Sequence, residues 1–202
     1  GSEMCIRDRI IPYLHELDER GIHYYFQITL NDYVTEKFEP NVPSVEKRVE
    51  TFKKLSDLIG RKRVIWRFDP LIITPSITPR ILLSRIWTIG NRLMDYTDKL
   101  VFSFVDVKAY RKVQNNLVKE TNYFTKDDVE SAEMTTVQRQ EIIEGLVKLR
   151  EAWAEKGWNI NLATCAEDID LESYGIEHNR CIDGELMECL FCEDRELVYY
   201  LR

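Results

Sequence analysis

Residues 64–74, with the sequence VIWRFDPLIIT, alternate bulky apolar side chains with charged ones. Side chains along a strand point alternately to its two faces, so Arg67 and Asp69 share one face. Trp66 and Phe68 share the other. A buried charge is costly unless it is paired, so the charged face either cross-links a polar core or lines a site. The Asp-Pro step ends the strand and places Asp69 at a carboxyl end, where ligand sites of parallel α/β folds lie.

Residues 24–30, 99–106 and 159–165 show the same alternation and are predicted to be strands. In each of them one face is bulky and apolar, as packing against a layer of helices requires. The other face is small or polar, and it carries Gln27, Thr29, Ser103, Asn161 and Cys165. We therefore expect the polar faces of the strands to line a cavity.

Helical patterns with recognisable ends separate the predicted strands. Ser44 is the expected N-cap of a helix that ends before Gly60, and Thr78-Pro79 begins the next helix. Thr135 begins a T-x-x-Q sequence that resembles a capping box, and a further helix comes before the first strand. Strands that alternate with helices indicate parallel βαβ units with right-handed crossovers. A closed parallel barrel needs about eight strands, so four predicted strands indicate an α/β fold that is a partial, half TIM-type (β/α) barrel.

The two ends of the chain do not continue these patterns. Residues 1–8 (GSEMCIRD) fit neither helix nor strand and resemble translated adapter sequence, so we expect them to be non-native. Residues 9–193 form the predicted barrel fragment, and residues 194–202 begin a segment that stops inside an amphipathic pattern. We therefore expect a barrel that is truncated at both ends, whose open strand edges favour self-association.

Charge and hydropathy argue against two classes of partner. The 202 residues carry a formal net charge of −7 at pH 7, whereas nonspecific nucleic-acid binding needs a cationic face. No apolar run reaches about 18 residues, the length of a membrane span. The N-terminus also lacks the apolar region of a secretory signal. We therefore expect a cytoplasmic protein that binds neither nucleic acid nor membranes.

Carboxylates and thiols supply the candidate chemistry. Asp69, Asp106 and Glu167 stand at predicted strand ends, where they suit acid and base catalysis in a cofactor-free barrel hydrolase or isomerase. Four cysteines lie in the last quarter of the chain, and zinc binding by them defines another alternative, a non-catalytic metal-binding domain. Cys189 and Cys192 have metal-ligand spacing, but the helix-like stretch around them favours two partly buried thiols on one helix.

Seven segments, taken together and in this order, resemble a family of uncharacterised bacterial proteins known only as a domain of unknown function. The segments are YYFQITL (24–30), EPNVP (39–43), VIWRFDP (64–70), SFVD (103–106), TCAE (164–167), YGIEH (174–178) and CIDGE (181–185). Full-length members of that family resemble radical S-adenosylmethionine (SAM) enzymes, with spore photoproduct lyase as a distant relative. The resemblance covers the chain from about residue 10 to residue 192.

The resemblance implies a radical-SAM-type (β/α) barrel whose full-length form binds SAM and a [4Fe–4S] cluster. In such families a C-x3-C-x2-C motif binds the cluster, and in this family the motif lies near the C-terminus. The present sequence contains no such motif. Both cofactors are therefore expected in the full-length protein, and neither is expected on this fragment. Cys165 and Cys181 are candidate ligands of an auxiliary cluster.

Under the same resemblance, the chain is a fragment of an iron–sulfur enzyme that acts on an unknown small molecule. It would supply a polar barrel wall, because the cofactor performs the difficult chemistry and the protein supplies placement. The side chains expected to bind SAM or substrate are Gln27, Thr29, Arg67, Ser103 and Asn161.

Overall fold

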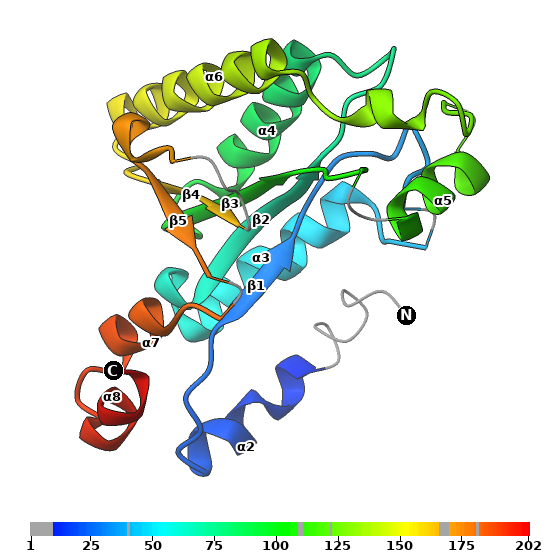
Figure 1. Ribbon diagram of the computed structural model, residues 1–202. Coiled ribbons are helices and arrows are strands. Elements are labelled where there is room, and N and C mark those ends of the chain that lie inside the picture. The colour runs from blue at the N-terminus through cyan, green and yellow to red at the C-terminus, as the bar shows by residue number, and fades with distance from the viewer. Residues whose placement is uncertain (1–9, 40, 109–110, 122, 166–169, 181) are drawn as a thin grey trace.

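A computed structural model describes residues 10–39, 41–108, 111–121, 123–165, 170–180 and 182–202. Its centre is a parallel sheet of five strands in sequence order (Figure 1). The strands are β1 (Phe26–Thr29), β2 (Val64–Leu71), β3 (Lys99–Phe104), β4 (Asn161–Cys165) and β5 (Ile176–Asn179). The predicted α/β class is confirmed, because every neighbouring pair of strands in this sheet is parallel.

The strand β5 corrects the prediction of about four strands. It is four residues long and lies at the edge of the sheet, where it pairs with β4. Its two central residues, Glu177 and His178, are exposed, so its sequence lacks the apolar face that marks the other strands. Within the described residues the sheet is open, with β1 and β5 at its edges. The sheet therefore shows an α/β fold but not a closed barrel.

Helices connect the first four strands, and further helices precede β1 and follow β5. They are α2 (Leu14–Glu19), α3 (Val45–Ile59), α4 (Pro79–Leu93), α5 (Arg111–Glu120), α6 (Thr136–Glu155), α7 (Gly184–Leu190) and α8 (Arg195–Leu201). Short 3-10 turns lie at Ile11–Tyr13, Arg61–Arg63, Val129–Ala132 and Glu172–Tyr174.

The predicted helix starts are confirmed. The hydroxyl groups of Ser44 and Thr78 each accept a backbone N–H bond from the first turn of their helix, at 3.4 Å in both cases. Thr135 and Gln138 form the complete capping box at the start of α6. Local hydrogen bonding thus begins α3, α4 and α6 at the positions that the sequence indicates.

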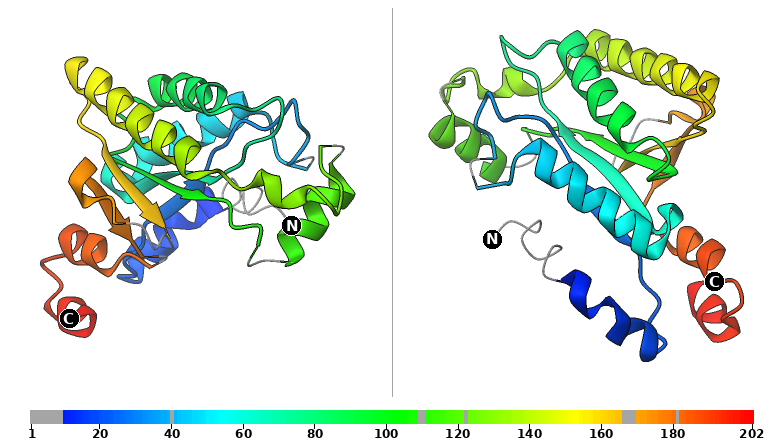
Figure 2. Two further views of the ribbon diagram at one scale, coloured as in Figure 1. Left: turned by 45° about the horizontal axis from the view of Figure 1, so that its top comes forward. Right: turned by 180° about the vertical axis from the view of Figure 1, so that it is seen from behind.

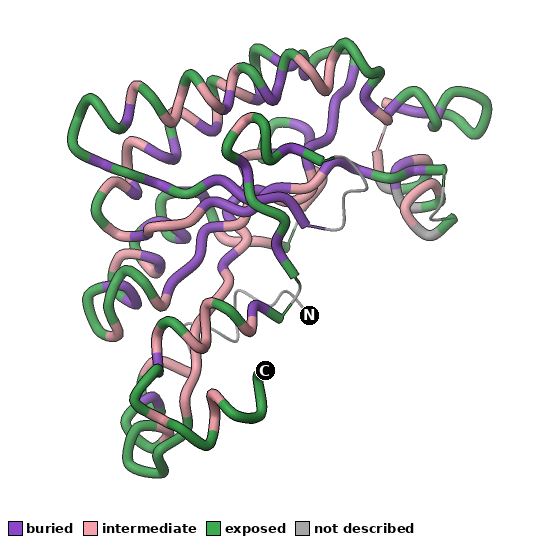
Figure 3. Tube along the Cα trace, turned by 60° about the vertical axis from the view of Figure 1, so that its left-hand side comes forward, coloured by how far each residue is buried: buried purple, intermediate pink, exposed green. Residues whose placement is uncertain are grey.

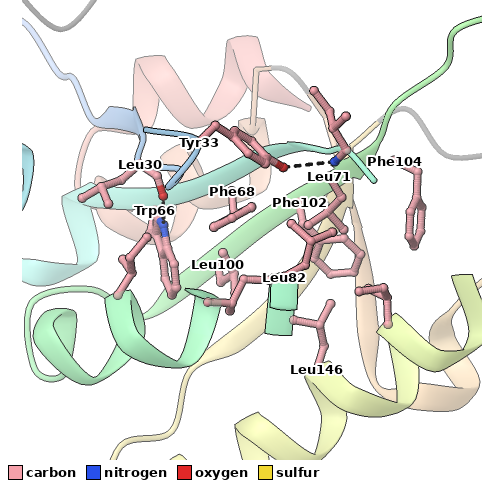
Figure 4. Close-up of a cluster of buried hydrophobic side chains, with 14 of the residues drawn as sticks. Leu30, Tyr33, Trp66, Phe68, Leu71, Leu82, Leu100, Phe102, Phe104 and Leu146 are labelled. Carbon is pink, nitrogen blue, oxygen red and sulfur yellow. Dashed lines mark hydrogen bonds between the residues drawn. The ribbon is translucent and has the colours of Figure 1, made fainter. Parts of the chain in front are cut away.

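The main core lies between the sheet and the helices α3, α4 and α6, which cover one face (Figure 2). Trp66 and Phe68 of β2 and Phe102 of β3 are fully buried. They belong to the same cluster as Leu82 of α4 and Leu146 of α6 (Figure 4). Burial of each such side chain stabilises the fold by about 1.5–3 kcal/mol. The bulky faces of the strands therefore meet helices, as the sequence predicts.

The opposite face of the sheet has a different composition. A small apolar cluster of Ile65, Val101, Ala163 and Cys165 lies on β2, β3 and β4. Arg67 pairs in register with Val101, which in turn pairs with Ala163. The predicted alternation along the strands is confirmed, because these residues share a face that is separate from the main core.

The C-terminal helices attach to the start of the chain at the amino ends of the strands. His23 Nε2 lies 3.0 Å from Asp194 Oδ2, and the His23 ring stacks on Phe191 with their centroids 4.2 Å apart. The guanidinium of Arg63 lies 5.3 Å from the centre of the same Phe191 ring. Figure 3 shows that most of the C-terminal segment is exposed or half-buried, so little of it belongs to the core.

Acid is expected to loosen α8 through its N-cap, Asp194. The Asp194 carboxylate accepts backbone N–H bonds from Glu196 at 3.1 Å and Leu197 at 3.0 Å. The Leu197 bond is the main cause that lowers the pKa of Asp194 below its ordinary value of 3.8, and the His23 bond lowers it further. Because the folded-state pKa is depressed, the stabilisation is complete above pH 3.8 and is lost as the pH falls through the lower value.

NMR spectra recorded at decreasing pH test this expectation. Backbone amide signals of α8 should change in acid before those of α6, whose capping box is uncharged. Asp194→Asn supplies the control, because asparagine is also a good N-cap but does not titrate. The acid step of α8 should therefore be absent in this variant, and a step of equal size would contradict the assignment to Asp194.

Candidate functional site

A polar cluster crosses three neighbouring strands on the face opposite the main core. Gln27 comes from β1, Arg67 and Asp69 come from β2, and Ser103 comes from β3. The Arg67 Nη1 group donates to Gln27 Oε1 at 2.9 Å, and the Nη2 group forms an ion pair with Asp69 Oδ2. The Ser103 hydroxyl donates to the other oxygen, Oδ1, of Asp69. Both oxygens of Asp69 are therefore engaged within the cluster.

The cluster is partly open to solvent. The side chain of Arg67 is 17% exposed and that of Asp69 is 23% exposed. Burial acts to lower the pKa of Arg67, but the charge of Asp69 and the neighbouring Cys165 together raise it above its ordinary value. The guanidinium is therefore a permanent cation on a face that solvent reaches.

Hydrogen-bond donors exceed acceptors at Arg67. A guanidinium carries five N–H donors and no acceptor. The buried Nε atom of Arg67 has no hydrogen-bond partner among the described residues. The other four N–H groups are on Nη1 and Nη2, which bond Gln27 and Asp69 and belong to a side chain that is 17% exposed. The cluster therefore has spare capacity to donate hydrogen bonds, which suits a ligand that carries oxygen acceptors.

Two buried side chains from the segment after β1 hold the backbone beside the cluster. Asn31 Nδ2 donates to the Asp69 carbonyl oxygen, and the Asp69 N–H donates to Asn31 Oδ1, both at 3.0 Å. The Tyr33 hydroxyl donates to the Pro70 carbonyl at 2.8 Å and accepts from the Ile72 N–H at 3.0 Å (Figure 4). Asn31 and Tyr33 are each 1% exposed. Side chains thus replace backbone pairing where β2 ends.

Helix α7 closes the same face at the amino ends of the strands. The Tyr25 hydroxyl accepts a hydrogen bond from Gln27 Nε2 at 3.2 Å and another from the Asp183 N–H at 3.0 Å. Lys99 Nζ donates to Asp183 Oδ2 at 2.9 Å. Leu186 of α7 packs against the small apolar cluster. Tyr25 therefore links the polar cluster to α7 at the amino ends of the strands.

A groove of about 550 Å³ opens between β5 and α7, away from Arg67. Lys99 at its edge is paired with Asp183 at 2.9 Å and with Glu177 at 3.3 Å. The cation of this half-buried side chain therefore already has two carboxylate partners.

A family model described as a domain of unknown function, DUF1848, matches residues 6–199. The chain belongs to the DUF1848 family. No curated protein and no solved structure matches it. The resemblance to an uncharacterised family is thereby confirmed, and the relation to radical SAM enzymes stays a prediction. Among the described residues of this DUF1848 chain, no helix combines the length and apolar character needed to cross a membrane.

The structure of the DUF1848 chain brings most of the predicted binding residues together. Gln27, Arg67 and Ser103 join Asp69 in one hydrogen-bonded cluster. Thr29 is half-buried and lies level with Arg67 on the neighbouring strand. The sequence pattern finds these residues because strand alternation alone decides which side chains share a face.

Asn161 is the exception among the predicted binding residues. It begins β4, pairs in register with Lys99 and is exposed. It therefore lies at the amino end of the sheet, whereas Asp69 lies at the carboxyl end of β2. The structure therefore does not place Asn161 in the cluster, and its binding role stays a prediction. Alternation predicts the face of a side chain but not its position along the strand.

Two of the three predicted acid–base carboxylates, Asp69 and Asp106, lie within the described residues, and the catalytic role of the set stays a prediction. Asp69 is held by Arg67 and Ser103, whereas Asp106 is exposed and lies two residues beyond the end of β3. Glu167, the third predicted carboxylate, lies outside the described residues, as does the candidate cluster ligand Cys181.

The described thiols do not form a metal site. Cys165 is buried on β4 beside Arg67, whereas Cys189 and Cys192 are exposed at the end of α7. The expectation of two partly buried thiols on one helix is wrong, because α7 ends at Leu190 and both side chains reach solvent. Across the described ranges, no three histidine, cysteine or acidic side chains are grouped to bind a metal ion.

Proposed function

We propose that the DUF1848 chain supplies the ligand-binding wall of a radical-SAM-like iron–sulfur enzyme with a small-molecule substrate. In this proposal the open sheet is one side of a (β/α) barrel and its polar face lines the interior. Arg67 binds a carboxylate of the ligand, either that of SAM or that of an acidic substrate. The observation that supports this role is a guanidinium that Gln27 and Asp69 hold in place and whose side chain is 17% exposed on the polar face of the open sheet.

The neighbours of Arg67 suit a role in orienting it. Gln27 and Asp69 bind its two terminal nitrogens from different strands, so they restrict rotation of the guanidinium plane. A fixed planar fork suits bidentate binding of a carboxylate, because two parallel N–H bonds add specificity as well as energy. Ser103 in turn holds the Asp69 carboxylate. Because these neighbours already fix the Arg67 side chain, less conformational entropy is lost when a ligand binds.

The residues in hand do not fit the [4Fe–4S] cluster that a radical SAM enzyme carries. A cluster requires several cysteine thiolates at one place. In the described segments, Cys165 is buried in the sheet, whereas Cys189 is exposed on α7 and Cys192 is exposed in the turn that follows it. We therefore assign no cluster ligand to these residues and derive no reaction step through a cluster. The proposal for this chain concerns ligand binding at Arg67.

The two other candidate functions lack a supporting observation in the described part of the chain. A hydrolase or isomerase needs a positioned acid and base, and in the described residues Asp69 is paired with the cation Arg67 and bonded by Ser103 rather than by a second carboxylate. A structural zinc site needs four ligands in a tetrahedral arrangement. No group of even three potential ligands is found among the described residues.

Titration of the chain with malonate tests the proposal. The Nε–Hε signal of Arg67, assigned by comparison with Arg67→Lys, should shift with malonate, because a carboxylate bound to the terminal nitrogens changes the electronic environment of the whole guanidinium. A second titration uses SAM. If SAM shifts the Arg67 signal and an S-adenosyl compound without a carboxylate does not, the carboxylate that Arg67 binds is that of SAM. Malonamide, which is neutral and similar in shape, should leave the signal unchanged. A signal that responds to neither malonate nor SAM would overturn the proposed role.

A further inference from the structure

The backbone of Asp69 lies where the regular pairing of β1 with β2 stops. The last register pair is Thr29 with Arg67, followed by a hydrogen bond from the Leu30 N–H to the Arg67 carbonyl at 2.8 Å. On the other side, the pairing of β2 with β3 shifts register between Phe68 and Leu71. Regular sheet pairing therefore does not fix the peptide groups of Asp69.

The Asn31 side chain takes the place of a strand at this point. Its amide both donates to the carbonyl and accepts from the N–H of Asp69, which is the pattern that a neighbouring strand would present. Asn31 is 1% exposed, so water does not compete for these two bonds. The direction in which Asp69 leaves the strand, and with it the position of its carboxylate, depends on this amide.

A buried arginine holds Asn31 in turn. Arg48 of α3 is 2% exposed, and its Nη2 group donates to the Asn31 carbonyl oxygen at 2.8 Å. Its Nη1 atom lies 3.6 Å from Glu39 Oε2. Burial lowers the pKa of Arg48 and raises that of Glu39. The Nε and Nη1 atoms of Arg48 have no hydrogen-bond partner among the described residues.

This arrangement is a poor source of stability. Well-packed apolar residues in place of a buried ion pair are often neutral or stabilising, and unused buried donors add a further cost. Departures from such packing rules are expected where a residue serves a site. Here the Arg48 guanidinium bonds the same residue that holds Asp69.

We infer that Asn31 is a positioning residue for the Arg67–Asp69 cluster and that Arg48 holds Asn31 for this purpose. The path runs from the Arg48 guanidinium to the Asn31 carbonyl, from the Asn31 amide to the Asp69 backbone, and from the Asp69 carboxylate to Arg67. The functional role of this positioning rests on the proposed function, because the Asp69 carboxylate orients the Arg67 guanidinium that binds the ligand. The positioning itself can be measured without any ligand.

Asn31→Ala and Tyr33→Phe form a matched pair that tests the inference. Each removes two hydrogen bonds from a buried side chain of the same segment, but only Asn31 bonds Asp69, whereas Tyr33 bonds Pro70 and Ile72. Both variants are expected to lower the melting temperature. Only Asn31→Ala should shift the Arg67 Nε–Hε signal and weaken malonate binding, by about tenfold or more. Equal effects of the two variants on this signal would overturn the inference.

A second variant decides the question if Asn31→Ala fails to fold. Arg48→Met combined with Glu39→Gln removes the charge of buried Arg48 and that of half-buried Glu39, and leaves Asn31 in place. The melting temperature should be unchanged or higher, because no charge remains buried without a partner. The Arg67 signal should nevertheless move in the direction seen for Asn31→Ala. An unchanged Arg67 signal would show that Arg48 has no positioning role.

The two proposals fail in distinguishable ways. If wild-type protein binds neither malonate nor SAM, the proposed function fails, whereas the effect of Asn31 on the ligand-free Arg67 signal still tests positioning. If ligand binds at Arg67 but the Asn31 and Arg48 variants leave affinity and signal unchanged, positioning fails and the proposed function stands.

Discussion

Replacing Gly90 with alanine is expected to lower the free energy of unfolding by about 2 kcal/mol. Gly90 lies on α4 where it meets α6, and an added Cβ would stand 2.2 Å from Cζ2 of Trp153. That ring has no room to move, because Trp153 is fully buried, stacks on Trp87 at 5.6 Å and lies 5.0 Å from Trp158. Overpacking costs about 3 kcal/mol, and the higher helix propensity of alanine offsets about 1 kcal/mol.

Gly145→Ala is the matched control, because Gly145 lies on α6 and its added Cβ would also stand 2.2 Å from a side-chain atom. That atom is Cδ1 of Leu83, the flexible end of a half-buried side chain. Rotation of Leu83 should relieve the contact, so Gly145→Ala should leave the free energy of unfolding unchanged or raise it by up to about 1 kcal/mol, the gain in helix propensity. Urea denaturation of both variants measures the difference. Equal losses would show that the packing around Trp153 is not more rigid than that around Leu83.

Much of the fold follows from local sequence patterns. Residues that alternate over five or more positions, as in β2, indicate both the strand and the face that meets the helices. Cap residues such as Ser44 and Thr135 indicate helix starts, because their side chains bond the first turn directly. These features need no knowledge of distant parts of the chain.

The strand β5 and the open shape of the sheet do not follow in this way. The sequence IEHN of β5 has no apolar stripe, and its pairing with β4 supplies the strand geometry. Whether a sheet closes depends on the number and tilt of its strands rather than on any single segment. Tertiary context therefore decides what local propensity leaves open.

The sequence predicts the charged residues of the polar cluster but not the residue that holds its backbone. Arg67 and Asp69 are marked by their place in a strand, but Asn31 follows a strand in a segment that carries no motif. The spacing of Arg48 does indicate its burial, because it lies three residues after Val45 and four before Phe52 on the apolar stripe of α3. A charged residue at such a position indicates a buried polar contact, but its partner depends on tertiary structure.

Arg67→Lys is expected to weaken binding of malonate by about 1.5–3 kcal/mol, the range for hydrogen bonds to charged groups. Lysine keeps the positive charge but has a single terminal nitrogen, so it cannot hold Gln27 and Asp69 while presenting a planar fork to a ligand. Calorimetric titration gives the affinity, and thermal unfolding gives the stability of the same sample. The melting temperature should stay close to that of the wild type.

Arg61→Lys provides the control for the arginine-to-lysine change itself. Arg61 lies shortly before β2 and forms a two-point contact with Asp98, at 2.6 Å from Nε and 2.5 Å from Nη2, but its side chain is 42% exposed. Exposed ion pairs contribute little to stability, about 1 kcal/mol or less. This variant should leave both affinity and melting temperature nearly unchanged. If Arg67→Lys lowers the melting temperature while malonate affinity stays at the wild-type value, then Arg67 serves only to hold the sheet face together.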